Sequence, residues 1–251
     1  MPRVLTSSMI SSLLACPYKG ALEYLGWQTN EAKPALDFGT RWHNWIEQTI
    51  KTGKPDFINC GDLPVASLKS WFYQAQENDV FELDFEPEVE AIKQIHANLW
   101  VACKADARST KTGQLMEHKT SSYVSNGYFL EKSVEPQPLI YAAVFNTKEI
   151  LWDVYNKKTG EVRFEWIRNL KTEDSLQLIL HADDLLIKGL QGLKVRGESC
   201  FHFFNKYCPY HPLCFNDDQA NVHQGEFNRF SQYSEEMRAF ILELVNNVLN
   251  S

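Results

Sequence analysis

The sequence lacks any long apolar run among its 251 residues. No segment approaches the roughly 20 consecutive apolar residues that an α-helix needs to cross a bilayer. The first 20 residues also lack an apolar stretch followed by the small-residue cleavage site of a secretory signal. We therefore expect a soluble, cytoplasmic protein that has no membrane partner.

An excess of positive charge is also missing. Lys and Arg number 25 against 32 Asp and Glu, which gives a formal net charge of −7. Binding of nucleic acid over the whole surface depends on clustered Lys and Arg, and this balance argues against it. A local basic groove stays open, and an acidic total suits a protein that gathers carboxylates around a divalent cation.

Internal repeats, low-complexity tracts and long Pro/Gly/Ser linkers are absent, which favours one compact domain over residues 1–251. Helical spacing of apolar residues predicts an N-terminal helix that leads on from Ser7 to about Leu25. Further helices are predicted at residues 38–50, 65–76, 138–145, 172–190 and 233–249. Short strands are predicted at 99–107 and 114–120 around a turn at 111–113, and a hairpin at 150–156 and 161–167. This order indicates an α/β fold in which helices flank a central mixed sheet.

Asp106, Glu117 and Lys119 are the residues that suggest chemistry. Glu117 and Lys119 stand two apart on a predicted strand, so their side chains share one face. If the preceding strand pairs with it as a hairpin, Asp106 approaches Glu117. Two carboxylates with a nearby lysine suit Mg²⁺ or Mn²⁺ and the hydrolysis of phosphodiesters. Lys119 could then orient or deprotonate a water, or stabilise charge on the phosphate. A solvated hairpin with ordinary surface charges would show the same pattern.

Two further motifs lie on either side of this pair. Gly39 and His43 form a G-x-x-x-H pattern on a predicted helix, and Gln137 and Tyr141 form a Q-x-x-x-Y pattern. With Asp106 and Glu117-x-Lys119, these motifs over roughly residues 5–145 resemble the RecB-like branch of the PD-(D/E)XK nuclease superfamily, which includes CRISPR-associated RecB-like exonucleases. The resemblance implies a restriction-endonuclease-like core.

The resemblance also implies a role for each matched residue. The implied metal ligands are His43, Asp106, Glu117 and the backbone carbonyl of His118. Lys119 would be catalytic, and Gln137 and Tyr141 would position Lys119 or the substrate phosphate.

Each matched residue also has a plainer interpretation. His43 could be an ordinary packed or surface histidine, and Tyr141 an ordinary core residue. Because Pro138 follows it, Gln137 is predicted to cap a helix rather than to lie within one. The family usually has an apolar residue where this chain has His118. We expect the His118 side chain to point away from Glu117 and Lys119, and to contact DNA or face solvent.

Cysteines form a second pattern. Six cysteines in an intracellular chain are more typical of buried thiols or metal ligands than of disulfides. Many RecB-like nucleases hold a [4Fe–4S] cluster with one cysteine before the core and three after it. That resemblance implies a cluster that joins the N-terminal helix to the C-terminal segment, with ligands Cys16, Cys200, Cys208 and Cys214. Seven residues separate Cys200 from Cys208, where the family usually has two. Cys60 and Cys103 fit no pattern and are predicted to be buried apolar residues.

The function that these patterns favour is a metal-dependent deoxyribonuclease, an exonuclease that prefers single-stranded or free-ended DNA. Aromatic residues near the site could stack on unpaired bases, namely Trp42, Trp45, Tyr123 and Tyr128. The alternative is a nucleic-acid-binding or assembly subunit with this fold and minor catalysis, and a third class is a zinc-binding module or small-molecule metalloenzyme. Protein partners in recombination, replication or CRISPR adaptation are expected.

Overall fold

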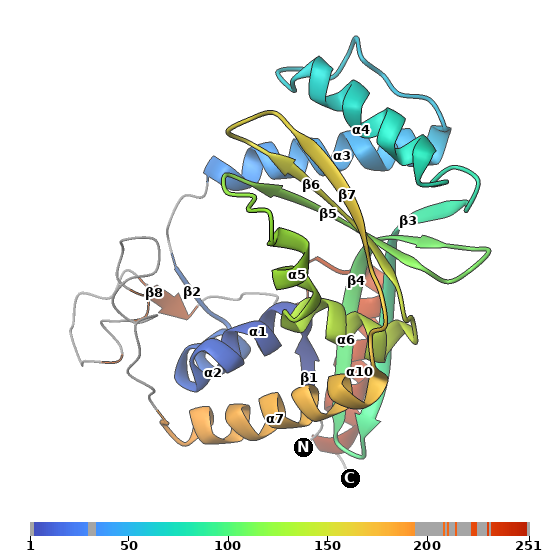
Figure 1. Ribbon diagram of the computed structural model, residues 1–251. Coiled ribbons are helices and arrows are strands. Elements are labelled where there is room, and N and C mark those ends of the chain that lie inside the picture. The colour runs from blue at the N-terminus through green and yellow to red at the C-terminus, as the bar shows by residue number, and fades with distance from the viewer. Residues whose placement is uncertain are drawn as a thin grey trace. The chain divides into compact units, whose positions relative to one another are not determined.

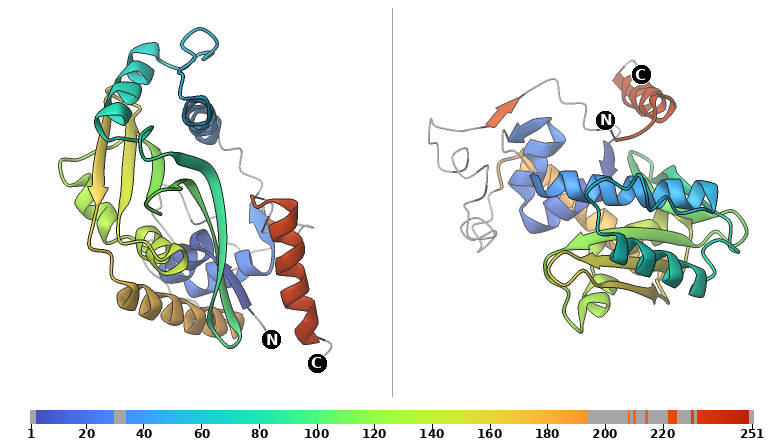
Figure 2. Two further views of the ribbon diagram at one scale, coloured as in Figure 1. Left: turned by 90° about the vertical axis from the view of Figure 1, so that its right-hand side faces the viewer. Right: turned by 90° about the horizontal axis from the view of Figure 1, so that it is seen from above.

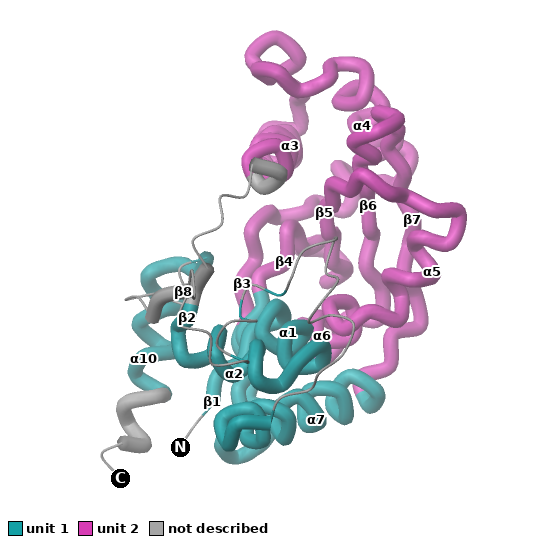
Figure 3. The backbone as a smooth tube through the Cα atoms, turned by 90° about the vertical axis from the view of Figure 1, so that its left-hand side faces the viewer, with its two compact units in different colours: residues 1–32, 92–103, 173–251 teal, residues 33–91, 104–172 magenta. Residues whose placement is uncertain are grey.

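Figure 1 shows the computed structural model, which describes residues 3–29, 34–193, 208, 210, 214, 222–224, 230 and 232–249. The chain divides into two compact units, shown in separate colours in Figure 3. Unit 1 comprises residues 1–32, 92–103 and 173–251, and unit 2 comprises residues 33–91 and 104–172. No helix within the described ranges has the length and apolar character needed to cross a bilayer.

The described helices and strands follow one another along the chain singly, in pairs and in one run of three strands, β3 to β5. The helices are α1 Ser7–Ala15, α2 Pro17–Tyr24, α3 Pro34–Thr52, α4 Val65–Glu77, α5 Tyr128–Ser133, α6 Pro136–Phe145, α7 Thr172–Leu190 and α10 Glu235–Leu249. The strands are β1 Arg3–Thr6, β2 Trp27–Thr29, β3 Phe85–His96, β4 Leu99–Ser109, β5 Leu115–Ser121, β6 Ile150–Asn156, β7 Val162–Ile167 and β8 Val222–Gln224.

A six-stranded mixed sheet forms the centre of the described fold. Its order is β1-β4-β5-β6-β7, and β3 pairs with β4 outside this path. The β1/β4 and β5/β6 pairs are parallel, whereas the β4/β5 and β6/β7 pairs are antiparallel. Helices flank this sheet, so the predicted α/β class is confirmed.

Unit 2 packs α3 and α4 against one face of β5, β6 and β7, as Figures 1 and 2 show. Because strand side chains alternate between faces, Met116, Leu151 and Tyr155 all reach this layer. Trp42 of α3 stacks on Tyr155 with ring centroids 4.4 Å apart. Trp71 of α4 is fully buried in the same cluster. Burial of such large rings supplies much of the apolar stabilisation of this unit.

Unit 1 contains the N-terminal helical segment, which is two helices rather than the one predicted. Cys16 adopts an extended backbone between α1 and α2, and Pro17 begins α2. Proline lacks a backbone N–H and suits the first turn of a helix, so the chain ends α1 and starts again there. Arg3 of β1 forms a bidentate ion pair with Asp183 of α7, which adds a polar tie within this unit.

Gly189 of α7 permits an unusually close approach to α2. A Cβ atom at position 189 would lie 2.2 Å from the backbone oxygen of Pro17. Such an atom cannot be accommodated without separation of the two helices, because the obstacle is backbone rather than a flexible side chain.

Gly189→Ala is therefore expected to destabilise the protein by about 1–3 kcal/mol, the usual cost of overpacking. On helix propensity alone the same change would stabilise by up to about 1 kcal/mol, so the sign of the effect is diagnostic. Gly39→Ala in α3 is the control, because its Cβ would meet only Thr120 Oγ1, at 3.4 Å. Urea unfolding measures both variants. Equal stability of the two would contradict the close approach of α7 to α2.

Candidate active site

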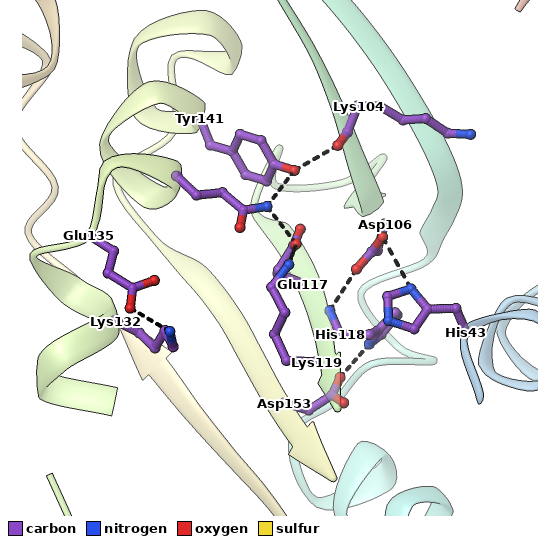
Figure 4. A network of polar contacts seen from close by, with 11 residues as sticks. His43, Lys104, Asp106, Glu117, His118, Lys119, Lys132, Glu135, Tyr141 and Asp153 are labelled. Carbon is purple, nitrogen blue, oxygen red and sulfur yellow. Dashed lines mark hydrogen bonds and ion pairs between the residues drawn. The ribbon is translucent and has the colours of Figure 1, made fainter. Parts of the chain in front are cut away.

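Strands β4 and β5 bring Asp106 next to the β5 backbone. Their antiparallel ladder has only two pairs, Ala107 with Met116 and Arg108 with Leu115. Beyond these pairs the two strands are no longer paired, and the Asp106 carboxylate replaces a backbone carbonyl as the hydrogen-bond acceptor for β5. The backbone N–H of His118 donates to Asp106 Oδ2 at 2.7 Å, as Figure 4 shows. The predicted approach of Asp106 to the Glu117 strand is thus observed.

Glu117 lies on the face of β5 opposite to the α3 and α4 layer, and it is almost fully buried. Lys119 Nζ donates to Glu117 Oε1. Gln137 Nε2 of α6 donates to the same oxygen at 2.6 Å. Glu117 Oε2 is buried and has no hydrogen-bond partner among the described residues. A buried carboxylate oxygen normally has a partner, so this atom is the one most open to a ligand.

Tyr141 connects α6 to both strands of the site. Gln137 Nε2 donates to Tyr141 Oη at 2.9 Å, and that hydroxyl donates to the backbone oxygen of Lys104 at 2.6 Å. Gln137 and Tyr141 therefore share one helix face, as their spacing of four predicted, and it is Gln137 that hydrogen-bonds Glu117.

The prediction that Gln137 caps its helix is wrong. The N-cap is Glu135, Pro136 occupies the first turn and Gln137 lies inside α6. A second proline at 138 is tolerated because the first turn of a helix has no intrahelical acceptors for its N–H groups.

His43 reaches Asp106 from α3. Its Nδ1 lies 3.6 Å from Asp106 Oδ1, which is an ion-pair distance rather than a hydrogen bond. Its ring also meets the His118 ring edge to face, with centroids 5.7 Å apart. Gly39, one turn earlier, has only Thr120 within Cβ reach, so the G-x-x-x-H segment lies alongside β5.

The two carboxylates have opposite electrostatic environments. Burial alone would raise the pKa of Asp106, but the neighbouring His43, with the charges of His118 and Lys119, outweighs it and lowers that pKa. Burial raises the pKa of Glu117, and repulsion from Asp106 raises it further against the attraction of Lys119. Asp106 is consequently the firmly ionised member of the pair.

Lys119 is held in its charged form. Burial would lower the pKa of its ammonium, but the Glu117 and Asp106 carboxylates outweigh burial and raise it. Lys119 Nζ also lies 5.5 Å from the centroid of the Trp152 ring, whose face attracts a cation. Near neutral pH the site therefore presents a fixed positive charge beside two carboxylates.

The His118 side chain points away from Glu117 and Lys119, as predicted, but the expectation that it faces DNA or solvent is wrong. His118 is 2% exposed, and its Nδ1 hydrogen-bonds the carboxylate of Asp153 on β6. Trp71 of α4 meets the ring from the side, with centroids 6.1 Å apart. Sequence reasoning missed Asp153, although a single acid within the apolar strand ILWDVYN was a signal that it needed a buried partner.

The potential ligands form a small set of hard oxygen donors. Within the described ranges, no three His, Cys, Asp or Glu side chains are grouped so that they could hold one metal ion together. Mg²⁺ usually keeps several waters and needs only one or two protein carboxylates. Asp106 and the unsatisfied Glu117 Oε2 meet that requirement, so the donor set fits such an ion.

Most of the aromatic residues expected to stack on bases are unable to do so. Trp42, Trp45 and Tyr128 are all less than 9% exposed, because they pack in the interior of unit 2. Only Tyr123, among the four, has an exposed ring, at 73%. Burial also raises the pKa of Tyr128 to about 12.

The predicted cluster cysteines are only partly described. Cys16 is buried, Cys208 and Cys214 are half-buried, and all three belong to unit 1. Cys200 lies outside the described residues. Cys60 and Cys103 are buried as predicted.

No protein-family model matches the sequence, and no curated protein matches it. Among solved structures, the crystal structure of SSO0001 has 14% sequence identity and a TM-score of 0.43, over 80% of this chain and 83% of that chain. The crystal structure of Scheffersomyces stipitis Rai1 has 10% identity and a TM-score of 0.29, over 79% of this chain and 63% of that chain. The structure of that Rai1 in complex with (3'-NADP)+ and calcium ion has 12% identity and a TM-score of 0.27, over 76% of this chain and 61% of that chain. These similarities are too low to assign the chain to a family.

Glu117→Gln is expected to leave the free energy of unfolding unchanged or to raise it by up to about 1 kcal/mol. Gln keeps the shape and one acceptor oxygen but removes a charge that burial disfavours. Because the folded pKa of Glu117 is raised, its penalty appears as pH rises through the unfolded value of about 4.3. Any gain should therefore vanish near pH 4.

The measurement is urea unfolding at pH 7 and pH 4, with the exposed Glu165→Gln on β7 as the matched control. The control should change stability by no more than about 0.5 kcal/mol at either pH. A loss of about 2 kcal/mol or more for Glu117→Gln at pH 7 would mean that the carboxylate holds the fold together instead.

Proposed function

We propose that the protein is a metal-dependent deoxyribonuclease with a PD-(D/E)XK core of the RecB-like type. The observation that carries the proposal is the environment of the His118 peptide. The His118 N–H donates a hydrogen bond to Asp106. The residues on either side of His118 are Glu117 and Lys119, whose side chains are hydrogen-bonded to each other. Two carboxylates and one ammonium, gathered from the adjacent strands β4 and β5, match the chemistry of phosphodiester hydrolysis.

Asp106, Glu117 and the backbone carbonyl of His118 would hold Mg²⁺ or Mn²⁺, with His43 beside Asp106 as a further ligand. When bound, the ion supplies a water of lowered pKa and polarises the phosphate. The unsatisfied Glu117 Oε2 supports this assignment, because a buried anionic oxygen without a donor is costly unless a cation or water meets it.

Lys119 stabilises the negative charge that builds on the phosphate. Its raised pKa keeps it protonated, which favours this role over proton abstraction from a water. Gln137 shares Glu117 Oε1 with the ammonium and so restricts where Lys119 can lie. Tyr141 in turn orients Gln137.

DNA with free ends or single strands is the proposed substrate. The preference rests on the resemblance of the motifs to RecB-like exonucleases, with the exposed ring of Tyr123 as the remaining candidate for stacking on bases. A cytoplasmic location and partners in recombination, replication or CRISPR adaptation belong to the same proposal.

Replacement of Asp106, Glu117 or Lys119 by Ala is expected to lower Mn²⁺-dependent cleavage by about 10²–10³-fold or more. Each change removes a charge that acts on the reacting phosphate. The assay uses end-labelled linear single strands, linear duplex and a covalently closed duplex circle, and wild type should digest the linear single strand fastest.

Glu165→Ala, an exposed carboxylate change on β7, is the control and should cleave like wild type. Circular dichroism checks that each variant is folded. Full cleavage by all three site variants would disprove the site, and a folded wild type that binds DNA without cutting it would favour the binding-subunit alternative. Equal rates on the linear single strand and the closed circle would disprove the end preference.

A [4Fe–4S] cluster on Cys16, Cys200, Cys208 and Cys214 is proposed as a structural cofactor. Anaerobically purified protein is expected to be brown with about four irons per chain. Cys16→Ala should bleach it and lower the melting temperature, because the cluster would close a long loop. Cys60→Ser is the control and should keep the colour. Colourless, iron-free and stable wild type would rule out the cluster.

A further inference from the structure

The His118 and Asp153 side chains form a buried polar pair that the chemistry proposed above does not use. Asp153 is 0% exposed, and its Oδ1 has no hydrogen-bond partner among the described residues. Removing a carboxylate from water costs several kcal/mol, and attraction to one partner does not always offset that cost. Stability alone therefore gives no reason to keep the pair.

The pair occupies a position where apolar residues would serve the core equally well. His118 and Asp153 are register partners on the parallel strands β5 and β6. One step earlier on the same face, the register partners are Met116 and Leu151, both fully buried. Beneath α3 and α4, the register partners on β5 and β6 thus change from an apolar pair to an ionisable pair at His118, the residue between Glu117 and Lys119.

His118 links three parts of the site from this position. Its backbone N–H donates to Asp106 Oδ2 at 2.7 Å. Its ring contacts the rings of His43 and Trp71, both edge to face. The hydrogen bond of Nδ1 to Asp153 fixes the rotation of this ring. A carboxylate that orients a histidine in this way is the usual support behind a metal ligand, although here the oriented ring is not itself the ligand.

We propose that Asp153 and the His118 side chain are positioning residues, which fix the His118 peptide against Asp106 and hold the His43 ring in place. The proposal rests on the proposed metal site. Asp153 lies on β6 and acts through His118 from the face of the sheet opposite to Glu117 and Lys119, so it touches neither the ion nor the substrate. Its loss should loosen the ligands without removing any of them.

A purely structural role makes a different prediction. If the pair only fills the core, replacement of both members by leucine should keep or raise stability and leave the metal site intact. If the pair positions the ligands, the same double variant should stay folded and bind metal poorly. The double variant therefore separates the two roles. The single variant Asp153→Leu cannot do this alone, because it leaves the buried His118 without its hydrogen-bond partner.

The experiment measures Mn²⁺ affinity by isothermal titration calorimetry, together with urea unfolding of the metal-free protein. The variants are Asp153→Leu, Asp153→Asn and the double variant His118→Leu/Asp153→Leu, with Asp106→Ala as the reference for loss of the site. Leu151→Ala is the matched control, because it perturbs the same face of β6 two residues away without any polar change. Asn at 153 can still accept from His118 Nδ1–H.

Asp153→Leu and the double variant are expected to lose about 10–100-fold in Mn²⁺ affinity, the usual effect of residues behind the ligands. Asp153→Asn should stay within about threefold of wild type, and Leu151→Ala should bind normally although it is less stable. Normal binding by a folded double variant would overturn the proposal alone. So would an equal loss of affinity in Leu151→Ala. Failure of wild type to bind Mn²⁺ would overturn the metal site and this proposal together.

Discussion

The site depends on one hydrogen bond, from the His118 N–H to Asp106 Oδ2 at 2.7 Å. Strands β4 and β5 pair over only two residue pairs, and beyond them a carboxylate replaces the backbone acceptor. A buried N–H needs some acceptor, so the fold gains from the same carboxylate that chemistry would use. The parting of these strands is what makes room for a site in an otherwise regular sheet.

Two helices of unit 2 then approach β5, one from each of its faces. α6 brings Gln137 and Tyr141 to Glu117, whereas α3 brings His43 to Asp106. The pKa values of Asp106 and Glu117 shift in opposite directions. For Asp106 the effect of His43, His118 and Lys119 outweighs burial, whereas for Glu117 burial and repulsion from Asp106 outweigh the attraction of Lys119. Asp106 is therefore the firmly ionised carboxylate, whereas ionisation of Glu117 lowers the stability of the folded state.

Much of unit 2 could be predicted from sequence. Strong 3.6-residue periodicity predicted α3 and α4 of unit 2, as well as α7 of unit 1, and the Lys111–Gly113 turn predicted the β4/β5 hairpin that brings Asp106 to Glu117. Short elements such as β1 and α5 carry too little periodicity to be recognised.

Tertiary partners explain the remaining misses. His118 was misassigned because its environment depends on Asp153, a residue 35 positions away whose pairing becomes visible only through the β5/β6 register. The start of α6 was misplaced for a local reason. Proline favours the first position of a helix, so α6 begins at Pro136, ahead of Gln137, and the sequence did contain this signal.

Strand alternation gives β5 a further property. Glu117 and Lys119 point to one face while His118 points to the other, so a shift of register by one residue would exchange the faces on which these side chains lie. The turn before β5 fixes the register, and Gly113 adopts a left-handed backbone there with φ of 75°. An insertion or deletion in this turn that shifts the register by one residue would turn Glu117 and Lys119 to the other face without altering any of these residues. Homologues that keep this arrangement of side chains should thus conserve the length of this turn more strictly than its composition.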